Sequence, residues 1–344
     1  MTQVAIQGAD SAAEALAAGL SVYTVTDIGP MGDIPTAVVS LGDNGVVVGV
    51  SQETPAFQWV PTKSNGTVGH ATPLDVFGSP FVFPAGVNAR GDIVGTYVTE
   101  DGQPHGFMIH NGKAKDIGTL GGPSSVANAI NDHDLVVGAS MTAAGAINAI
   151  SYDGKLHNLG TTHSGDQYSE AFSVNEAGVA VGRSGPEPSA SVAAVFFNGH
   201  AQSLGTLGGD TSSSTDINNL NVIVGFSQMI GGAEHGFIYG SLVPGARMKD
   251  IGTLGGPNSI AGSINDRGVI VGQADTPATA TTGLPDAFVD ILGVKMFDLN
   301  NLISTGAHAH WDLVQALSIN ERGQIAGIGL EDGSPHAFLL TPAI

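Results

Sequence analysis

Two histidines and an aspartate near the end of the chain have a spacing that suits a metal site. They stand in His308-Ala-His310-Trp-Asp312, where one residue separates each ligand-type side chain from the next. In an extended segment the three side chains face the same way, because alternate residues of a strand share a face. Imidazole and carboxylate groups bind divalent metals. The spacing therefore indicates a divalent metal site formed by His308, His310 and Asp312, with Trp311 as a ligand-binding neighbour. The alternative is a polar rim without a metal.

A second segment, residues 160–170, carries groups that exchange protons. It contains His163, Tyr168 and Glu170. A histidine and a carboxyl or phenol group act as general base and acid when both reach the same substrate atom. Together with His308, these residues are candidate catalytic groups for a lyase, hydrolase or cyclase acting on a small molecule. The alternative is an ordinary polar loop.

Aromatic residues mark a third irregular place, residues 76–84. Phe81 and Phe83 lie there, next to Pro80 and Pro84. They either wall an apolar pocket as ligand-binding residues or fill the inner end of a structural element.

A repeat runs through the whole chain and must position all of these residues. Seven versions of Ala129-Ile-Asn-Asp-His-Asp-Leu-Val-Val-Gly138 occur, with steps of 43 to 55 residues between them. Their turn position is occupied by Gly42, Asn88, Asn131, Asn175, Asn218, Asn265 and Asn320. Asn and Gly suit tight hairpins, so the motif itself is interpreted as structural. A repeat of this length indicates a solenoid, a propeller or an array.

Each repeat is predicted to form four short strands. In the third copy the strands cover residues 125–130, 135–140, 146–152 and 156–159, which is the size of one propeller blade. The last copy lacks a fourth strand, whereas residues 22–28 form a spare one. We therefore predict an all-β fold, a seven-bladed β-propeller with four-stranded antiparallel blades, in which the N-terminal strand (about 22–28) closes the last blade. Residues 1–21 are predicted to be an N-terminal leader or short helix, and residues 22–344 a single propeller domain.

Three motifs recur in the same order along the chain. They are Asp-Ile-Gly-Thr-Leu-Gly-Gly at 116–122 and 250–256, the Ile-Asn turn motif, and His336-Ala-Phe338 with its variants His105-Gly-Phe107 and His235-Gly-Phe237. In these motifs the chain resembles the HAF-repeat family of bacterial proteins. The resemblance implies a β-propeller, often in an exported protein, but no single activity that could be transferred.

The composition excludes several classes of function. The formal net charge of −20 is spread along the chain, which argues against nucleic acid and membrane partners, since both require clustered Lys and Arg. The absence of cysteine excludes disulfides, thiolate metal ligands and cysteine nucleophiles. The N-terminus has no basic residue followed by an apolar core, so a cytoplasmic location is expected. The alternative is an exported protein whose leader is absent from this chain.

A binding propeller is the preferred interpretation of the function. Its loop face and channel mouth would be presented to a small molecule, glycan or protein partner. The small-molecule enzyme described above is the alternative. No cofactor is indicated other than the divalent metal.

Overall fold

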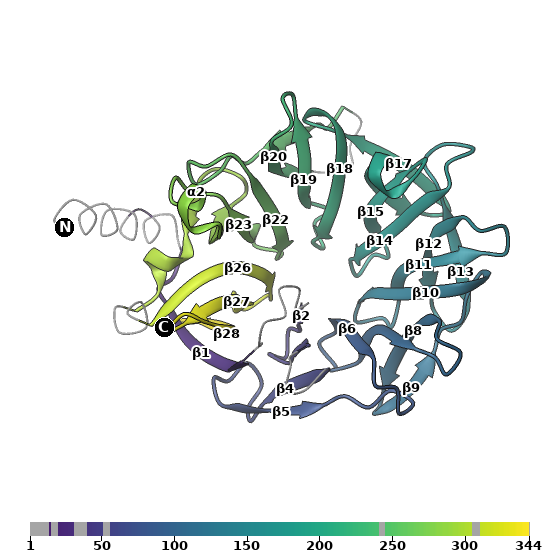
Figure 1. Cartoon of the computed structure of the whole chain (residues 1–344), viewed down its shortest axis with the longest axis horizontal. Helices are drawn as coiled ribbons and strands as arrows, with labels where there is room; N and C mark the ends of the chain where they lie inside the picture. The colour runs from purple at the N-terminus through teal and green to yellow at the C-terminus, as the bar shows by residue number, and fades with distance from the viewer. Residues whose placement is uncertain are drawn as a thin grey trace.

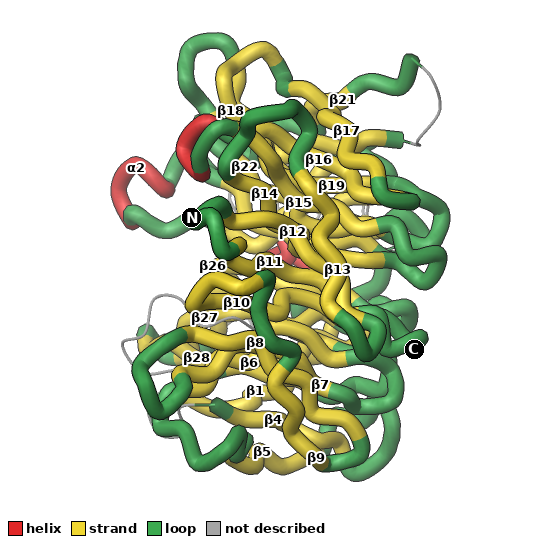
Figure 2. Tube along the Cα trace, turned by 90° about the vertical axis from the view of Figure 1, so that its right-hand side faces the viewer, coloured by secondary structure: helices red, strands yellow, loops and turns green. Residues whose placement is uncertain are grey.

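The computed structural model describes residues 14, 20–30, 40–50, 56–240, 245–304 and 310–343, which are mostly β-strands. The strands form sheets arranged in a ring around a central opening (Figure 1). Seen from the side, the strands occupy the middle of the ring and the loops gather along its faces (Figure 2). The predicted all-β propeller fold is therefore confirmed.

Five of the sheets have four antiparallel strands each. The first contains β2 (Ser40–Leu41), β3 (Val47–Gly49), β4 (Phe57–Pro61) and β5 (Gly69–Pro73). The second contains β6 (Val82–Val87), β7 (Ile93–Val98), β8 (Pro104–His110) and β9 (Lys113–Asp116). The third contains β18 (Gly208–Ile217), β19 (Ile223–Met229), β20 (Glu234–Tyr239) and β21 (Met248–Asp250). The fourth contains β22 (Ser259–Ile264), β23 (Val269–Ala274), β24 (Asp286–Ile291) and β25 (Met296–Asp298). The fifth contains β26 (Trp311–Ile319), β27 (Ile325–Glu331), β28 (Ser334–Pro342) and β1 (Tyr23–Pro30).

The sixth sheet has eight strands and corrects the predicted number of blades. It contains β10 (Gly121–Ile130), β11 (Val136–Thr142), β12 (Ile147–Tyr152), β13 (Leu156–Gly160), β14 (Tyr168–Val174), β15 (Ala180–Gly185), β16 (Val192–Phe197) and β17 (His200–Gly205). Two repeats join there because Ile147 of β12 pairs in parallel with Tyr168 of β14. The prediction of seven separate four-stranded blades is therefore wrong: in the described part of the chain the ring has five such blades and one eight-stranded sheet.

Among the described residues, helical structure is found at Glu14 in the N-terminal segment and in three short connections. The connections are η1 (Pro188–Ala190), α2 (Thr279–Thr282) and η2 (Leu299–Leu302). No helix in the described part of the chain has the length and apolar character needed to cross a membrane.

The two ends of the chain meet in the fifth four-stranded sheet, as predicted. Strand β1 runs antiparallel to β28, with Tyr23 opposite Pro342 and Pro30 opposite His336. Figure 1 shows β1, in purple, beside the yellow C-terminal strands. The predicted closure of the last blade by the N-terminal strand is confirmed, and it covers an edge that would otherwise be unpaired.

The repeated asparagine links each repeat to the next. In Asn175, Oδ1 accepts hydrogen bonds from the backbone N–H groups of Ala177 and Val179, and Nδ2 donates to the carbonyl oxygen of Asn218 at 3.1 Å. The equivalent Nδ2 bonds run from Asn88 to Asn131, Asn131 to Asn175, Asn218 to Asn265, Asn265 to Asn320, and Asn320 to Gly42. The motif is thus a structural device that satisfies buried polar groups at the junctions between repeats.

Two further repeated residues, the glycine that ends the turn motif and the phenylalanine of the His-Ala-Phe motif, pack against each other on neighbouring strands. Gly225 pairs with Phe237, and a Cβ atom at Gly225 would lie 2.9 Å from the Phe237 ring and 2.0 Å from the carbonyl oxygen of Ser213. Phe237 is fully buried. Glycine is required there because the aromatic ring and the adjoining bulged strand occupy the space of any side chain.

The histidine of the His-Ala-Phe motif forms a hydrogen-bonded pair within its own sheet. Nδ1 lies 2.8 Å from an Asp116 carboxylate oxygen for His105, 2.9 Å from Asp250 for His235, and 3.0 Å from Asp27 for His336. These histidines are structural, and they hold the outermost strand to its neighbour.

Candidate functional site

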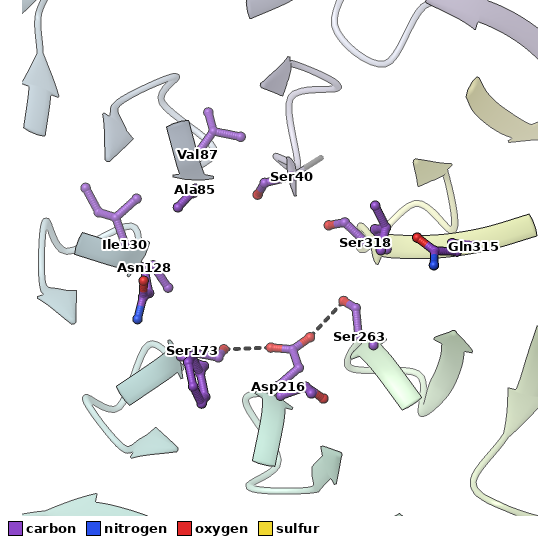
Figure 3. A pocket seen from close by; sticks show the side chains of 16 residues that line it. Ser40, Ala85, Val87, Asn128, Ile130, Ser173, Asp216, Ser263, Gln315 and Ser318 are labelled. Carbon is purple, nitrogen blue, oxygen red and sulfur yellow. Dashed lines mark hydrogen bonds between the residues drawn. The ribbon is translucent and has the colours of Figure 1, made fainter. Parts of the chain in front are cut away.

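A cavity of about 530 Å³ lies at the centre of the ring. Its wall is formed by the inner strands of the sheets, seen from close by in Figure 3. The apolar part of the lining includes Ala85, Val87, Ile130, Phe172 and Leu317, and the polar part includes Ser40, Asn128, Ser173, Thr215, Asp216, Ser263, Gln315 and Ser318. A concave site of this size, lined by both apolar side chains and convergent polar groups, suits a small ligand.

Asp216 on β18 is the one carboxyl group among the described residues that line the cavity. Its Oδ1 accepts hydrogen bonds from Ser173 Oγ at 2.6 Å and from the backbone N–H of Ile217 at 2.9 Å. Its Oδ2 accepts from Ser263 Oγ at 2.8 Å and from the backbone N–H of Ile264 at 2.9 Å. Figure 3 shows the carboxyl group between the two serines. Four donors, drawn from three sheets, therefore hold it in one orientation.

Burial determines the ionisation of Asp216. Removal from bulk water raises the pKa of its carboxyl group, and the four hydrogen bonds oppose that rise without cancelling it. The cavity wall thus carries a carboxyl group that is harder to ionise than an exposed one.

Asp216 was not among the residues predicted from the sequence, although a signal was present. It stands two residues before the repeated asparagine, where the other copies have Ser40, Gly86, Ala129, Ser173, Ser263 and Ser318. One carboxyl group among six small residues interrupts the repeat at a single position. Alignment of the seven copies at that position would have identified it.

The structure brings together two of the predicted catalytic residues, Tyr168 and Glu170 on β14. The Tyr168 hydroxyl lies 2.5 Å from Glu170 Oε2, and Arg183 Nη2 donates to the same hydroxyl at 2.8 Å. Glu170 Oε1 accepts a hydrogen bond from Asn128 Nδ2 at 3.1 Å, and Asn128 lines the cavity. This cluster therefore lies beside the cavity wall.

The environment of Tyr168 favours a structural role for its hydroxyl group over a role in proton transfer. Burial and the neighbouring Glu170 carboxylate raise the pKa of the Tyr168 hydroxyl. Such a group stays protonated near neutral pH and is a poor general base. Arg183, which was not predicted from the sequence, lies 5.1 Å from the Tyr168 ring centre and 5.4 Å from that of Phe172. The cluster thus packs against Phe172, an aromatic residue of the cavity wall.

His163, the third residue predicted in this loop, is exposed to solvent. Its side chain is 72% exposed, and its Nδ1 lies 3.5 Å from Asp166 Oδ2 in the same loop. The structure therefore places His163 in a local pair, whereas Tyr168 and Glu170 bond with Arg183.

The predicted metal site is only partly visible. His308 lies outside the described residues. His310 is exposed, and its Nδ1 is 2.9 Å from Asp332 Oδ1, a hydrogen bond that raises the pKa of His310. Asp312 is exposed on β26. A histidine whose protonated form is favoured is a weaker metal ligand.

Trp311, predicted as a ligand-binding neighbour of the metal site, is buried. It is 7% exposed and contacts Phe338 and His336 with ring centres 6.1 Å apart in each pair. Most of the indole is therefore covered by the protein's own core. In the ring, β26 and β14 lie on opposite sides of the central opening, with β18 and β22 between them (Figure 1).

Two other clusters in the described residues bring three metal-type ligand atoms within 4.8 Å of one another. They are Asp27, Glu331 and His336, and Asp92, His110 and Asp134. In the first, the His336–Asp27 pair repeats the His–Asp hydrogen bond of the other sheets. In the second, Arg90 already binds Asp92 at 3.2 Å. Hydrogen bonds and ion pairs therefore explain why the side chains of both clusters lie close together.

Phe81 and Phe83 are exposed, which excludes the interpretation that they fill the inner end of a blade. Their exposed fractions are 58% and 51%. Phe81 lines a surface groove together with Phe77, and Phe83 lies nearby on β6.

Asp312 lies near Asp286 and Asp298, two carboxyl groups that stand where other sheets have a structural His–Asp pair. In the fourth four-stranded sheet, Asp286 occupies the position that His105, His235 and His336 occupy elsewhere. Burial and the charges of Asp298 and Asp312 raise the pKa of Asp286 to about 6.

Replacing Asp286 by His is expected to stabilise the protein at neutral pH, because it restores a His–Asp pair with Asp298. A carboxyl group with a raised folded-state pKa contributes stability at low pH and loses it as the pH rises from 3.8 to about 6. At pH 8 we expect Asp286→His to raise the free energy of unfolding by on the order of 1 kcal/mol, measured by urea denaturation. Asp286→Asn, which removes the charge without adding the imidazole, should gain less. Equal stability of all three proteins at pH 8 would contradict this expectation.

Comparison with known proteins supports the fold. A family model described as "Protein of unknown function (DUF3466)" matches residues 157–337. No curated protein matches the sequence. These findings do not test the resemblance to the HAF-repeat family, which stays a prediction.

Several solved structures are similar in shape, at low sequence identity. The structure of YCF48 bound to D1 peptide has a TM-score of 0.51 and 11% identity, and the match covers 94% of this chain and 97% of that one. The β-propeller domain of the Trilobed protease from Pyrococcus furiosus has a TM-score of 0.49 and 8% identity, covering 92% of this chain and 95% of that one. TolB from Acinetobacter baumannii has a TM-score of 0.42 and 14% identity, covering 64% of this chain and 60% of that one. At this level of identity the similarity concerns the fold alone.

Proposed function

We propose that this chain, which belongs to the DUF3466 family of proteins of unknown function, is a binding propeller whose central cavity takes up a small polar ligand. The ligand class we favour carries hydroxyl or amino groups. The observation that carries this proposal is the cavity of about 530 Å³ with a single carboxyl group, Asp216, in its wall.

The chemistry of the lining supports a ligand that donates hydrogen bonds. Hydroxyl, carboxamide and carboxyl oxygens of the wall accept such bonds, and apolar side chains beside them cover the carbon skeleton of a small molecule. An ammonium group bound beside Asp216 favours the ionised form of its carboxyl group, and the charge attraction then opposes the rise in pKa that burial causes. Each of the two serine partners of Asp216 donates its hydroxyl hydrogen to the carboxyl group, and the serine oxygen can still accept a hydrogen bond from a ligand.

The small number of titratable groups in the cavity wall favours binding over catalysis. Among the described lining residues, Asp216 alone titrates, and its four hydrogen bonds already hold it. General acid–base catalysis usually requires a second group within reach of the same atom.

A partner protein could supply the ligand group as a side chain. A solved structure with a TM-score of 0.51 to this chain, YCF48, is bound to a peptide, which gives one precedent for peptide binding by a protein of similar fold.

The enzyme alternative rests on Tyr168 and Glu170. They lie beside the cavity, and Glu170 shares Asn128 with its wall. In this alternative Glu170 would act as the base and Tyr168 as its hydrogen-bonded partner. Loss of turnover in Glu170→Gln, with ligand affinity unchanged, would favour it over simple binding.

The Asp216→Ser variant tests the binding proposal. Serine occupies the equivalent position in four other copies of the repeat, so we expect the free energy of unfolding to change by only about 1 kcal/mol. In a ligand-observed NMR screen of small amines, polyols and carboxylic acids, the parent should bind amines or polyols, and the variant should bind them at least about tenfold more weakly.

Asp210→Ser is the matched control, since Asp210 is an exposed carboxyl residue on the same strand and does not line the cavity. Binding that is equally strong in Asp216→Ser and in the parent, or a preference for carboxylic acids, would refute the proposal.

A further inference from the structure

A second concave site lies on the protein surface, away from the central cavity. It is a groove of about 800 Å³ between residues 77–81 and residues 97–102, and it shares no lining residue with the cavity. The first segment lies between β5 and β6, and the second runs from the end of β7 into the loop that leads to β8. We call it the aromatic groove, because Phe77, Phe81 and Tyr97 line it.

The aromatic groove exposes an unusual amount of apolar side chain. Phe77 is 55% exposed and Phe81 is 58% exposed. The Phe77 ring rests against Tyr97, with ring centres 4.9 Å apart and planes inclined by 52°. Contiguous exposed aromatic residues in a concavity are typical of binding surfaces.

Hydrogen bonds hold the two walls of the groove in place. Ser79 Oγ donates to the carbonyl oxygen of Val98 at 2.8 Å, and the N–H of Val98 donates to the carbonyl oxygen of Phe81 at 3.0 Å. The groove is therefore preorganised, which reduces the entropic cost of binding.

The backbone at Phe77 is strained in a way that keeps its ring exposed. Phe77 has φ +53° and the next residue, Gly78, has φ +68°, in a turn closed by the bond from Ser79 N–H to the carbonyl oxygen of Val76. Asparagine or glycine adopts positive φ at lower cost than a bulky aromatic residue. Phe77 leaves 55% of its surface exposed, so burial offsets only part of this cost, and strain of this kind concentrates at binding sites.

The charge of the groove selects the kind of ligand. Glu100 and Asp101, both exposed, line it, and no Lys or Arg is among its described lining residues. The faces of aromatic rings and the carboxylates both attract a cation. A guanidinium group also stacks on aromatic rings and forms paired hydrogen bonds with a carboxylate.

We propose that the aromatic groove binds an arginine-bearing segment of a partner protein. The arginine side chain stacks on Phe77 and Phe81 and pairs with Glu100 or Asp101 at the rim. Aromatic residues and arginine are both enriched at protein interfaces, and the two exposed rings offer more contact than a single small cation can cover. This site goes beyond the binding proposed for the central cavity and does not depend on it.

Phe77→Asn is the decisive variant. It removes the ring and relieves the positive φ, so the free energy of unfolding should stay the same or rise. Binding of a fluorescein-labelled peptide of alternating Arg and Gly, measured by fluorescence anisotropy, should weaken about tenfold. Glu100→Gln should weaken binding and reduce its dependence on salt.

Three controls test whether peptide binding depends on the aromatic groove itself. Phe197→Asn removes an exposed phenylalanine elsewhere, which is 43% exposed, and should leave peptide affinity unchanged. Asp216→Ser should also leave it unchanged, so failure of the cavity proposal and failure of this one are distinguishable. A peptide of alternating Glu and Gly should not bind. Equal binding of the Arg and Glu peptides, unchanged affinity in Phe77→Asn, or binding of neutral glycans in place of the Arg peptide would overturn the proposal.

Discussion

A chain that starts after Pro30, and therefore lacks strand β1, is expected to lose cooperative folding or to unfold at a temperature more than about 10 °C lower than the parent. Strand β1 pairs with β28 over seven pairs of residues, and it buries Tyr23 and Ile28 in two different core clusters. Each of these side chains contributes about 1.5–3 kcal/mol by burial. The sum is a large part of the 5–15 kcal/mol that stabilises an average domain.

Loss of β1 also uncovers the edge of β28, which offers unpaired backbone groups to other molecules. We therefore expect the shortened protein to aggregate. Differential scanning calorimetry and size-exclusion chromatography measure the two effects.

A circularly permuted chain is the control for this deletion. The backbone N–H of Ala343 donates to the carbonyl oxygen of Val22 at 2.7 Å, so residues 20–30 can follow Ala343 through a short glycine-rich linker. The permuted protein, starting at Ser40, should recover most of the melting temperature, because β1 again pairs with β28. A deletion variant as stable as the parent would show that β1 is not needed to close the ring.

Asn175→Ala is expected to lower the free energy of unfolding by about 3 kcal/mol. Asn175 is 3% exposed, and its side chain serves three backbone groups: the N–H groups of Ala177 and Val179 and the carbonyl oxygen of Asn218. Alanine would leave these groups without their partner in a place that water does not reach freely. Leaving buried polar groups unsatisfied costs more than a hydrogen bond contributes on average. Urea denaturation followed by tryptophan fluorescence measures the change.

Asn148→Ala is the matched control, since its side chain makes one exposed hydrogen bond to Asn158. It should cost less than about 0.5 kcal/mol. If the two variants lose similar stability, the junction bonds between repeats are not a main source of stability.

Much of the fold could be predicted because its signals are local. The turn at Asn175 and the strand before it follow from the turn chemistry of asparagine and from alternation along the strand. The pairing of β1 with β28 followed from a count of strands at the two ends of the chain. The parallel pair between Ile147 and Tyr168 was not predicted, because one backbone pairing between repeats leaves no mark on composition or spacing.

The candidate site was harder to predict, because its residues meet across repeats. Ser173, Asp216 and Ser263 are more than 40 residues apart in sequence, and they meet only because three inner strands stand side by side. A bulge between Ser214 and Asp216 also shifts the alternation of β18, so a simple period of two does not show which side chain faces the cavity.

The spacing of His310, Trp311 and Asp312 in the sequence did not show which groups these side chains contact. His310, Trp311 and Asp312 follow the alternation of a strand, yet His310 pairs with Asp332 and Trp311 is covered by the core. The sequence by itself determined the strands, their turns and the closure of the ring, because these depend on neighbouring residues and on a repeat. Only the tertiary structure decided which polar groups converge on the cavity, since that depends on bulges, strand register and contacts between distant repeats.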